Sequence, residues 1–170
     1  RPYERLFELL VPPGHPYRWP VIGTMDDIAS ATLEDVRAFF ETWYVPNNAV
    51  LTLAGDFDPG AALASVERWF GELAPGPRPQ RGRFVLAPLE AAVAETVEDS
   101  VQLPRVYFAF RIPPFGDSEW FASALLANLL SDGKSSPLYR DLVWERQLAQ
   151  EVACYVYPTA QAGFFIAIAT

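Results

Sequence analysis

Residues 105–112, RVYFAFRI, form the clearest strand pattern in the chain and decide its fold class. Aromatic and β-branched residues at this density are typical of a sheet strand. A helix pattern follows, with Asp117 or Ser118 as its cap and with apolar positions at Phe121, Leu125, Leu126, Leu129 and Leu130. Asp132-Gly133 ends that helix, and Ser136-Pro137 begins another, which extends to about Arg146.

Further strand patterns lie on both sides of these helices. Residues 92–97 predict a strand before them, and residues 151–157 and 163–169 predict a hairpin after them. We therefore expect residues 84–170 to form a sheet with two helices on one face. Since the last strand pattern stops at Thr170, that sheet should have an exposed edge, and exposed edges tend to pair. Self-association of the chain is expected for that reason.

The first half of the chain predicts an α–β–α order. Residues 3–11 look like the end of a helix, Thr24 and Thr32 are helix caps, residues 49–55 are a strand, and Asp58-Pro59 begins a helix that ends at Phe70. Residues 75–83, PGPRPQRGR, have the composition of a stiff linker. The whole pattern is α+β with mostly antiparallel sheet and helices packed on one face.

Composition excludes several classes of function. The chain has 170 residues with 13 Lys and Arg against 21 Asp and Glu, so its net charge is −8. Binding to duplex nucleic acid or to an anionic membrane surface is unexpected at this charge, and no apolar run is long enough for membrane insertion. The single cysteine, Cys154, excludes an internal disulfide and a cysteine-based zinc knuckle.

The sequence contains no self-contained active site. It has no HExxH or HxxEH motif, no phosphate-binding Gly-Lys loop and no G-x-S-x-G elbow. Its one histidine, His15, cannot form a His-rich metal site alone, and a structural role in its loop outweighs a catalytic one. Cys154 is interpreted as a small core residue, and the aromatic stretch 107–110 as sheet core rather than a base-stacking platform.

Two pairs of carboxylates could in principle serve as acid–base groups, but helix capping explains them better. These pairs are Asp26 with Asp27 and Asp56 with Asp58. The chain begins at Arg1 with no initiator Met or signal peptide, and its end falls within an alternating apolar run. We expect it to be a piece of a longer polypeptide, called the parent protein below.

Three stretches carry a resemblance to a known family. They are HPYRWPVIGTMDDI (15–28), WYVPNNAVLTLAGDFD (43–58) and GKSSPLYRDLV (133–143). Their order and spacing resemble the pitrilysin/insulinase (M16) zinc metallopeptidases, which include mitochondrial processing peptidase. The resemblance implies LuxS/MPP-like half-domains. The sequence departs from the family pattern at Arg18, where Gly is usual, and at Pro137, where Arg is usual.

The resemblance also implies where the chain lies in such a protein. Residues 1–74 would be the C-terminal part of the metal-bearing first domain, 75–83 a linker, and 84–170 the N-terminal part of the second, non-metal domain. The family's zinc ligands, an HxxEH helix and a distal Glu, lie upstream of the HPY loop. Glu4 and Glu8 are near the right element, but family spacing puts the distal Glu before Arg1. No catalytic, cofactor-binding or metal-ligating residue is therefore assigned here, and zinc is expected only in the parent.

Non-catalytic halves of the family carry an Arg and, seven residues later, a Tyr that hold substrate against the zinc of the partner half. Val143 stands at the Arg position and Gln150 at the Tyr position, while Arg146 is out of register. The resemblance therefore implies the back portion of a catalytic-type half, which needs a homologous second half, fused or as a separate subunit.

We therefore interpret the chain as a piece of a zinc-dependent metalloendopeptidase that degrades or processes peptides. This portion would be scaffold, chamber wall and contact to the partner half, and inactive alone. The alternative is a non-peptidase structural or interaction subunit of the same fold, like the family's core subunits of respiratory complexes. A small-molecule-binding α+β module has no specific support. We expect a bacterial periplasmic or envelope location rather than a cytoplasmic one.

Overall fold

The computed structural model describes residues 2–170, which group into two compact units. One unit contains residues 2–21 and Arg83–Thr170, and the other is Ile22–Gly82. The first helix of the chain therefore packs with the second half of the sequence.

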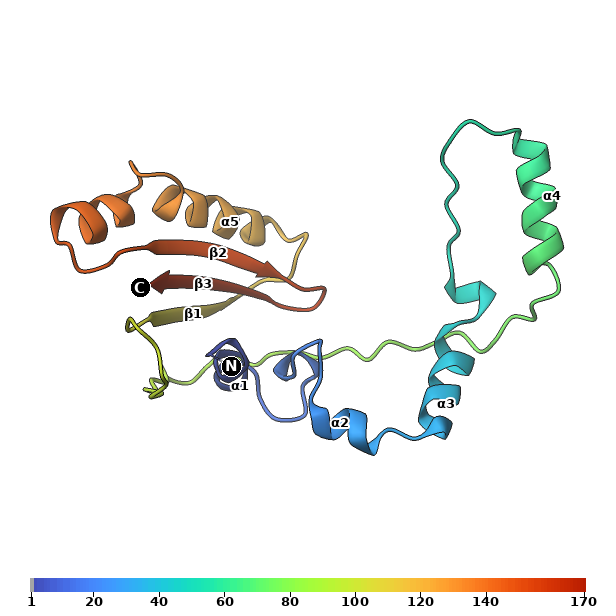
Figure 1. Cartoon of the computed structure of the whole chain (residues 1–170), viewed down its shortest axis with the longest axis horizontal. Coiled ribbons are helices and arrows are strands. Elements are labelled where there is room, and N and C mark those ends of the chain that lie inside the picture. The colour runs from blue at the N-terminus through green and yellow to red at the C-terminus, as the bar shows by residue number, and fades with distance from the viewer. Residues whose placement is uncertain (1) are drawn as a thin grey trace. The chain divides into compact units, whose positions relative to one another are not determined.

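The first unit is built on a three-stranded antiparallel sheet of β1 (Val106–Ile112), β2 (Val152–Pro158) and β3 (Gly163–Ala169), in the order β1-β3-β2 (Figure 1). The β2–β3 hairpin and the strand at 105–112 confirm the α+β, antiparallel prediction. The last strand lies in the centre of the sheet, where Phe165 is in register with both Phe110 and Val156. Within the described residues, the open edges thus belong to β1 and β2.

Helices cover the two faces of this sheet. Figure 1 shows α5 (Ser118–Ser131) on one face and α1 (Pro2–Leu10) on the opposite face. The core lies between α1 and the sheet, where the side chains of Phe164 and Ile166 are both 0% exposed. The ring of Phe7 in α1 packs edge-to-face on that of Phe164, with ring centres 5.0 Å apart. Helices therefore lie on both faces of the sheet, whereas the sequence predicts them on one face only.

Helix α5 forms where the sequence predicts it, with Asp117 as its cap, but it turns a different face to the sheet. We expected Phe121, Leu125 and Leu129 to pack inward, and all three are exposed. Ala127 is the buried residue, and Ser131 on the same side accepts a hydrogen bond of 2.7 Å from the backbone N–H of Cys154. Small side chains let the helix backbone approach the sheet closely, which explains the reversal.

A π-helix, η3 (Tyr139–Glu145), follows α5 where the second helix was predicted. After it the N–H groups of Leu148 and Ala149 both donate to the carbonyl of Leu142. The turn between them requires a left-handed backbone at Gln147, with φ of 51°. Non-glycine residues rarely adopt this conformation, so the turn is strained.

The second unit contains α2 (Met25–Ser30), α3 (Leu33–Trp43), the short 3-10 helix η2 (Pro46–Asn48) and α4 (Pro59–Phe70). A further 3-10 helix, η1 (Pro16–Arg18), belongs to the first unit. Thr24 and Thr32 each form a capping box, and the Asp58 side chain accepts from the N–H of Ala61 at 2.7 Å. The three predicted caps are confirmed.

Two predicted strands, 49–55 and 92–97, are wrong: the described chain has no strand at either stretch. A strand needs a hydrogen-bonded neighbour, and no described residue pairs with these segments. In the first of them, Val50 is 93% exposed. Val45 is the one buried residue among those described in Ile22–Gly82, so this unit has almost no core of its own.

Candidate functional site

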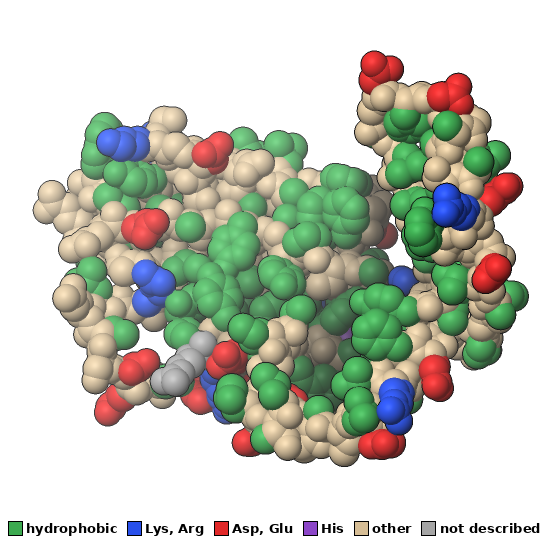
Figure 2. Space-filling view, turned by 45° about the vertical axis from the view of Figure 1, so that its right-hand side comes forward, with side chains coloured by type: hydrophobic (Ala, Val, Ile, Leu, Met, Phe, Trp, Pro, Cys, Tyr) green, Lys and Arg blue, Asp and Glu red, His purple; other side chains and the backbone are tan. Residues whose placement is uncertain are grey.

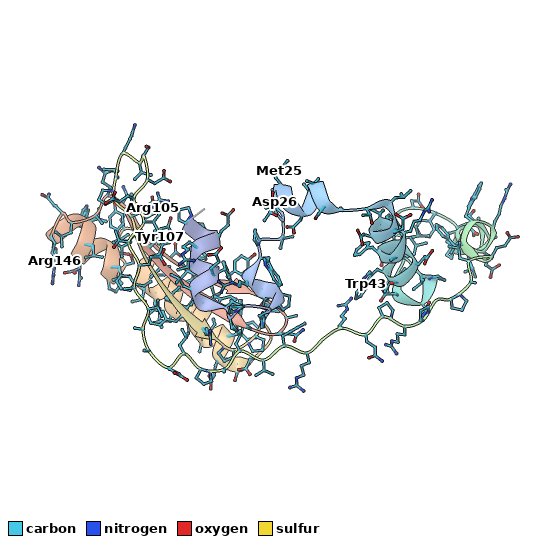
Figure 3. The ribbon with its side chains drawn as sticks, turned by 90° about the horizontal axis from the view of Figure 1, so that it is seen from below. Met25, Asp26, Trp43, Arg105, Tyr107 and Arg146 are labelled. Carbon is cyan, nitrogen blue, oxygen red and sulfur yellow. The ribbon has the colours of Figure 1, made fainter. Side chains whose placement is uncertain are left out.

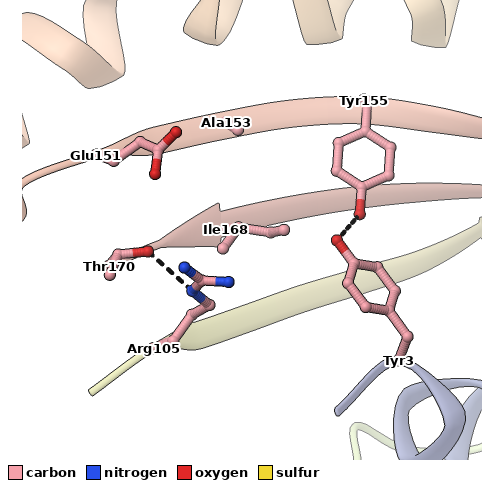
Figure 4. A pocket seen from close by; sticks show the side chains of 7 residues that line it. All are labelled: Tyr3, Arg105, Glu151, Ala153, Tyr155, Ile168 and Thr170. Atoms are coloured by element: carbon pink, nitrogen blue, oxygen red, sulfur yellow. Dashed lines mark hydrogen bonds between the residues drawn. The ribbon is translucent and has the colours of Figure 1, made fainter. Parts of the chain in front are cut away.

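A pocket of ≈ 250 Å³ lies at the end of the sheet where β1 begins and β3 ends (Figure 4). Helix α1, the segment before β1 and the neighbouring strands β2 and β3 supply its walls. Ala153 and Ile168 are paired in the sheet register, so their side chains point to the same face. The lining residues are Tyr3, Arg105, Glu151, Ala153, Tyr155, Ile168 and Thr170.

Two tyrosines close one side of the pocket. The hydroxyl of Tyr3 is hydrogen-bonded to the hydroxyl of Tyr155, which joins α1 to β2. The Tyr3 ring also packs edge-to-face on Tyr107, with ring centres 5.7 Å apart. Burial, followed by the bond to Tyr3, raises the pKa of the Tyr155 phenol above its ordinary value. The Tyr155 phenol therefore stays protonated at neutral pH, as a donor or acceptor rather than a base.

Arg105 supplies a fixed positive charge on the opposite side. Its Nε donates to the hydroxyl of Thr170 at 2.9 Å, and Figure 3 shows it beside Tyr107. Hydrogen bonding and charge interaction with Tyr107 raise the pKa of the guanidinium, and Glu151 adds to the rise. A guanidinium and two phenols can hold a carbonyl or carboxylate group. The lining also includes the Glu151 carboxylate, which disfavours an anion, and the Thr170 hydroxyl, which is bonded to Arg105.

Val143 and Gln150, the two positions that the resemblance compares with an Arg and a Tyr, differ in exposure. Gln150 is exposed beside the pocket, and its N–H donates to the carbonyl of Thr170 at 2.7 Å. Val143 is half-buried in η3 and does not line the pocket. Arg146, at the end of η3 in Figure 3, is paired with Asp141 at 3.1 Å. Neither Val143 nor Gln150 lines the pocket.

His15 is 5% exposed and belongs to a packed loop. Its Nδ1 accepts a hydrogen bond of 3.1 Å from the N–H of Tyr17, and its ring lies 5.5 Å from that of Phe84. Burial, with a smaller effect from the charge of Arg111, lowers the pKa of the imidazole. The neighbouring Arg18 donates to the carbonyls of Glu8 and Val11, so it ties the loop to the end of α1.

Other candidate groups make local contacts. Cys154 is half-buried in β2, and burial raises the pKa of its thiol. The carboxylate of Asp27 accepts hydrogen bonds from the side chain and the backbone of Thr24, and these bonds lower the pKa of Asp27. Neither group has the environment of an activated nucleophile or base.

A catalytic zinc does not fit the residues that the structure describes. Among residues 2–170, no group of three or more His, Cys, Asp and Glu side chains is placed to hold a metal ion. In α1, the carboxylate of Glu8 forms an ion pair with Arg5. No helix in the same range is long and apolar enough to cross a membrane.

Sequence reasoning missed the pocket at the end of the sheet. Tyr3, Arg105 and Tyr155 come from three distant segments, and the sheet register together with the packing of α1 brings them together. The sequence carries no local motif that could have indicated the pocket.

Comparisons with known proteins agree with the fold. Residues 30–170 match the family model described as the peptidase M16 inactive domain. The chain is 30% identical over 164 residues to the zinc protease PqqE of Helicobacter pylori, which covers 91% of this chain and 36% of that protein. It is 29% identical over 157 residues to the uncharacterized zinc protease YmfH of Bacillus subtilis. That alignment covers 88% of this chain and 36% of YmfH.

Solved structures give the same result. A protease from Helicobacter pylori is 28% identical, with a TM-score of 0.71 over 98% of this chain and 41% of that chain. A peptidase M16 inactive domain from Pseudomonas fluorescens shares the fold at 22% identity, with a TM-score of 0.71. The match covers 98% of this chain and 40% of that chain. The chain thus spans little more than a third of the curated relatives, 36% in both. Because the family model matches most of its residues, this chain belongs to the peptidase M16 family, within the domain of that family described as inactive.

Proposed function

We propose that this chain is a non-catalytic part of a zinc-dependent metalloendopeptidase that degrades or processes peptides. Its role is to scaffold the enzyme, to wall the chamber that holds the peptide and to contact the partner half. The observation that carries the proposal is the match of residues 30–170 to the inactive domain of a peptidase family. The relative PqqE is named a zinc protease, which supports zinc as the metal of the parent.

The zinc of the parent is then held by residues outside this chain. The described residues offer no three-ligand group, and a catalytic zinc site needs three protein ligands. We place residues 1–74 in the metal-bearing first domain, 75–83 in a linker and 84–170 in the second domain. The packing of α1 on the sheet supports an association of this one helix with the second domain.

A second, homologous half completes the substrate site in this proposal. Val143 offers no donor and Gln150 no phenol, so this half lacks the Arg and Tyr that would hold a substrate carbonyl. Losing one donor at a developing oxyanion typically lowers the rate by about two to three orders of magnitude. The partner half supplies both groups, whether it is fused or a separate subunit.

A non-peptidase interaction subunit is the second candidate. The fold alone is shared with a chain of complex III2 from Candida albicans, at 18% identity and a TM-score of 0.69. A zinc-ligand helix in the parent favours the peptidase, and its absence favours the interaction subunit. For the location we propose the periplasm or envelope, because one solved relative is described as the periplasmic protease PqqL from Escherichia coli.

Peptidase assays of the catalytic half, alone and with its partner half, test the proposal. We expect activity only when both are present. Val143→Arg with Gln150→Tyr should leave the activity of the complete enzyme no higher, because the groups would be restored in the wrong half. Full activity of the catalytic half as a monomer, or a rate gain from the double substitution, contradicts the proposal.

A further inference from the structure

The linker at residues 75–83, PGPRPQRGR, concentrates arginines in a chain whose net charge is −8. It belongs to no helix or strand, and Arg78, Arg81 and Arg83 are all exposed. Among the described residues, none of these three arginines forms an ion pair. Lys and Arg side chains are scattered over the face drawn in Figure 2 and form no continuous basic patch there. An exposed, extended segment with accessible arginines is the kind of substrate that a trypsin-class endopeptidase binds.

The two ends of the linker are anchored, whereas its middle is not. The side chain of Asn47 exchanges two hydrogen bonds with the backbone of Gly76, both of 3.0 Å. At the other end, the N–H of Phe84 donates to Oε1 of Gln161 at 2.6 Å. Both anchors lie outside residues 77–83, so this stretch can enter the cleft of a protease without breaking either of them.

One of the three arginyl bonds suits cleavage best. The bond after Arg78 precedes Pro79, whose ring and missing N–H obstruct a protease at the scissile bond. The bond after Arg83 adjoins the anchored N–H of Phe84. The bond between Arg81 and Gly82 lies between the anchors, and glycine presents no side chain beyond the scissile bond.

Lys134 is an exposed cation in another loop, but its backbone is held in a turn. The N–H of Ser136 donates to the carbonyl of Gly133 at 3.2 Å, which closes the turn around Lys134. A closed turn differs from the extended backbone that a protease cleft requires. The linker is therefore the better substrate.

Cleavage of the linker would place α1 and the sheet on different pieces, although both belong to one compact unit. Leu10 and Val11, at the end of α1, are 4% and 1% exposed and pack in the core with Phe164. Nε of Arg111 in β1 donates to the carbonyl of Leu10 at 2.6 Å. Arg5 in α1 also pairs with Glu95 at 2.7 Å. Apolar burial and these polar contacts connect the two pieces without the linker.

We propose that the Arg81–Gly82 bond is a processing site for a trypsin-class serine endopeptidase, and that the cleaved parent persists as two pieces held together by α1. Cleavage consumes one water molecule. The bond between the Arg81 carbonyl carbon and the Gly82 nitrogen breaks, the carbon gains the hydroxyl of the water, and the nitrogen gains its proton. The inference concerns the linker and α1 alone and does not rest on the proposed peptidase function.

Limited digestion of the native full-length parent with trypsin tests the site, with the new chain ends identified by mass spectrometry. We expect the first cut within residues 1–170 to fall after Arg81. Arg81→Gln should slow cleavage of the linker at least about tenfold, because the remaining bonds need local opening. Arg78→Gln is the matched control and should leave the rate unchanged, since Pro79 already blocks that bond. A first cut after Lys134, or equal rates for the two variants, would overturn the proposal.

Gel filtration of the cleaved parent under native conditions tests whether α1 holds the pieces. We expect the two pieces to elute together, and their separation would overturn the proposal. Phe7 packs on Phe164 with ring centres 5.0 Å apart, so Phe7→Ala should lower the urea concentration at which the cleaved pieces separate. Phe70→Ala is the control, because Phe70 ends α4 and is 52% exposed, and it should leave that concentration nearly unchanged. Equal urea concentrations for the two variants would contradict the role of α1.

Discussion

The hydroxyl of Tyr3 in α1 is hydrogen-bonded to the hydroxyl of Tyr155 in β2, which links the first helix of the chain to an edge strand 152 residues away in sequence. The link closes one side of the pocket and fixes α1 on the face of the sheet opposite α5.

Removing one hydroxyl of this pair should weaken the attachment of α1. Tyr155→Phe is expected to lower the free energy of unfolding by about 1 kcal/mol, the usual net value of a hydrogen bond. Tyr157→Phe is the control. The ring centres of Tyr157 and Phe7 are 5.4 Å apart, and the substitution removes the hydroxyl but keeps this ring contact. Urea denaturation of both variants measures the difference, and equal losses would contradict a role for the pair.

The same pair predicts a loss of stability at alkaline pH. The pKa of Tyr155 is raised in the folded state, so the unfolded chain loses its phenolic proton first as pH rises. The folded state then binds more protons than the unfolded state, and its stability falls as pH increases above about 10. Tyr155→Phe should reduce that fall, as measured by unfolding at pH 8 to 11 in about half-unit steps.

His15 predicts the opposite behaviour in mild acid. Its pKa is lowered in the folded state, so the unfolded chain binds a proton first as pH falls below about 6.5. Stability should therefore decrease as pH falls through this window. His15→Asn keeps an acceptor for the N–H of Tyr17 but does not titrate, and it should flatten the profile between about pH 5 and 7. An unchanged slope in this variant would show that other groups dominate.

The strained turn after η3 predicts a stabilising substitution. Gln147 has φ of 51°, a conformation that glycine adopts without steric penalty. Gln147→Gly should raise the free energy of unfolding by about 0.5–1 kcal/mol. Gln150→Gly is the control, because Gln150 lies outside the left-handed region, and it should be neutral or destabilising. Stabilisation by both substitutions would point to a general effect of glycine in this loop.

The bond between α5 and β2 can be tested with a matched serine pair. Ser131 accepts from the backbone N–H of Cys154, whereas the Ser123 hydroxyl donates to the Glu119 carbonyl within its own helix. Ser131→Ala should lower the free energy of unfolding by about 1–2 kcal/mol, because it leaves the Cys154 N–H without its partner. Ser123→Ala should change it by less than about 0.5 kcal/mol, and an equal effect of the two would contradict the assigned role.

Local features were predictable from the sequence, whereas long-range ones were not. Thr32 and Asp58 cap their helices because capping depends on a few neighbouring residues, and these patterns are visible in sequence. The stretch 49–55 has the composition of a strand, but a strand also requires a partner, and no described residue supplies one. For α5 the apolar pattern predicts the helix correctly but not which side faces the sheet, because apolar residues occur on all sides of the helix.

The site shows the same division. The pocket formed by Tyr3, Arg105 and Tyr155 could not be predicted, because it depends on the sheet register and on the packing of α1. The expectation that this chain holds no zinc ligand stays a prediction. The proposed domain boundaries at 75–83, and the self-association expected from open strand edges, stay predictions.

Zinc analysis of two purified proteins tests the central claim most directly. The 170-residue chain and the parent are each dialysed against metal-free buffer, and their zinc per polypeptide is measured by mass spectrometry. The account predicts close to one zinc in the parent and well below one in the 170-residue chain, because its described residues hold no three-ligand group. Stoichiometric zinc bound by side chains of the 170-residue chain would contradict the account.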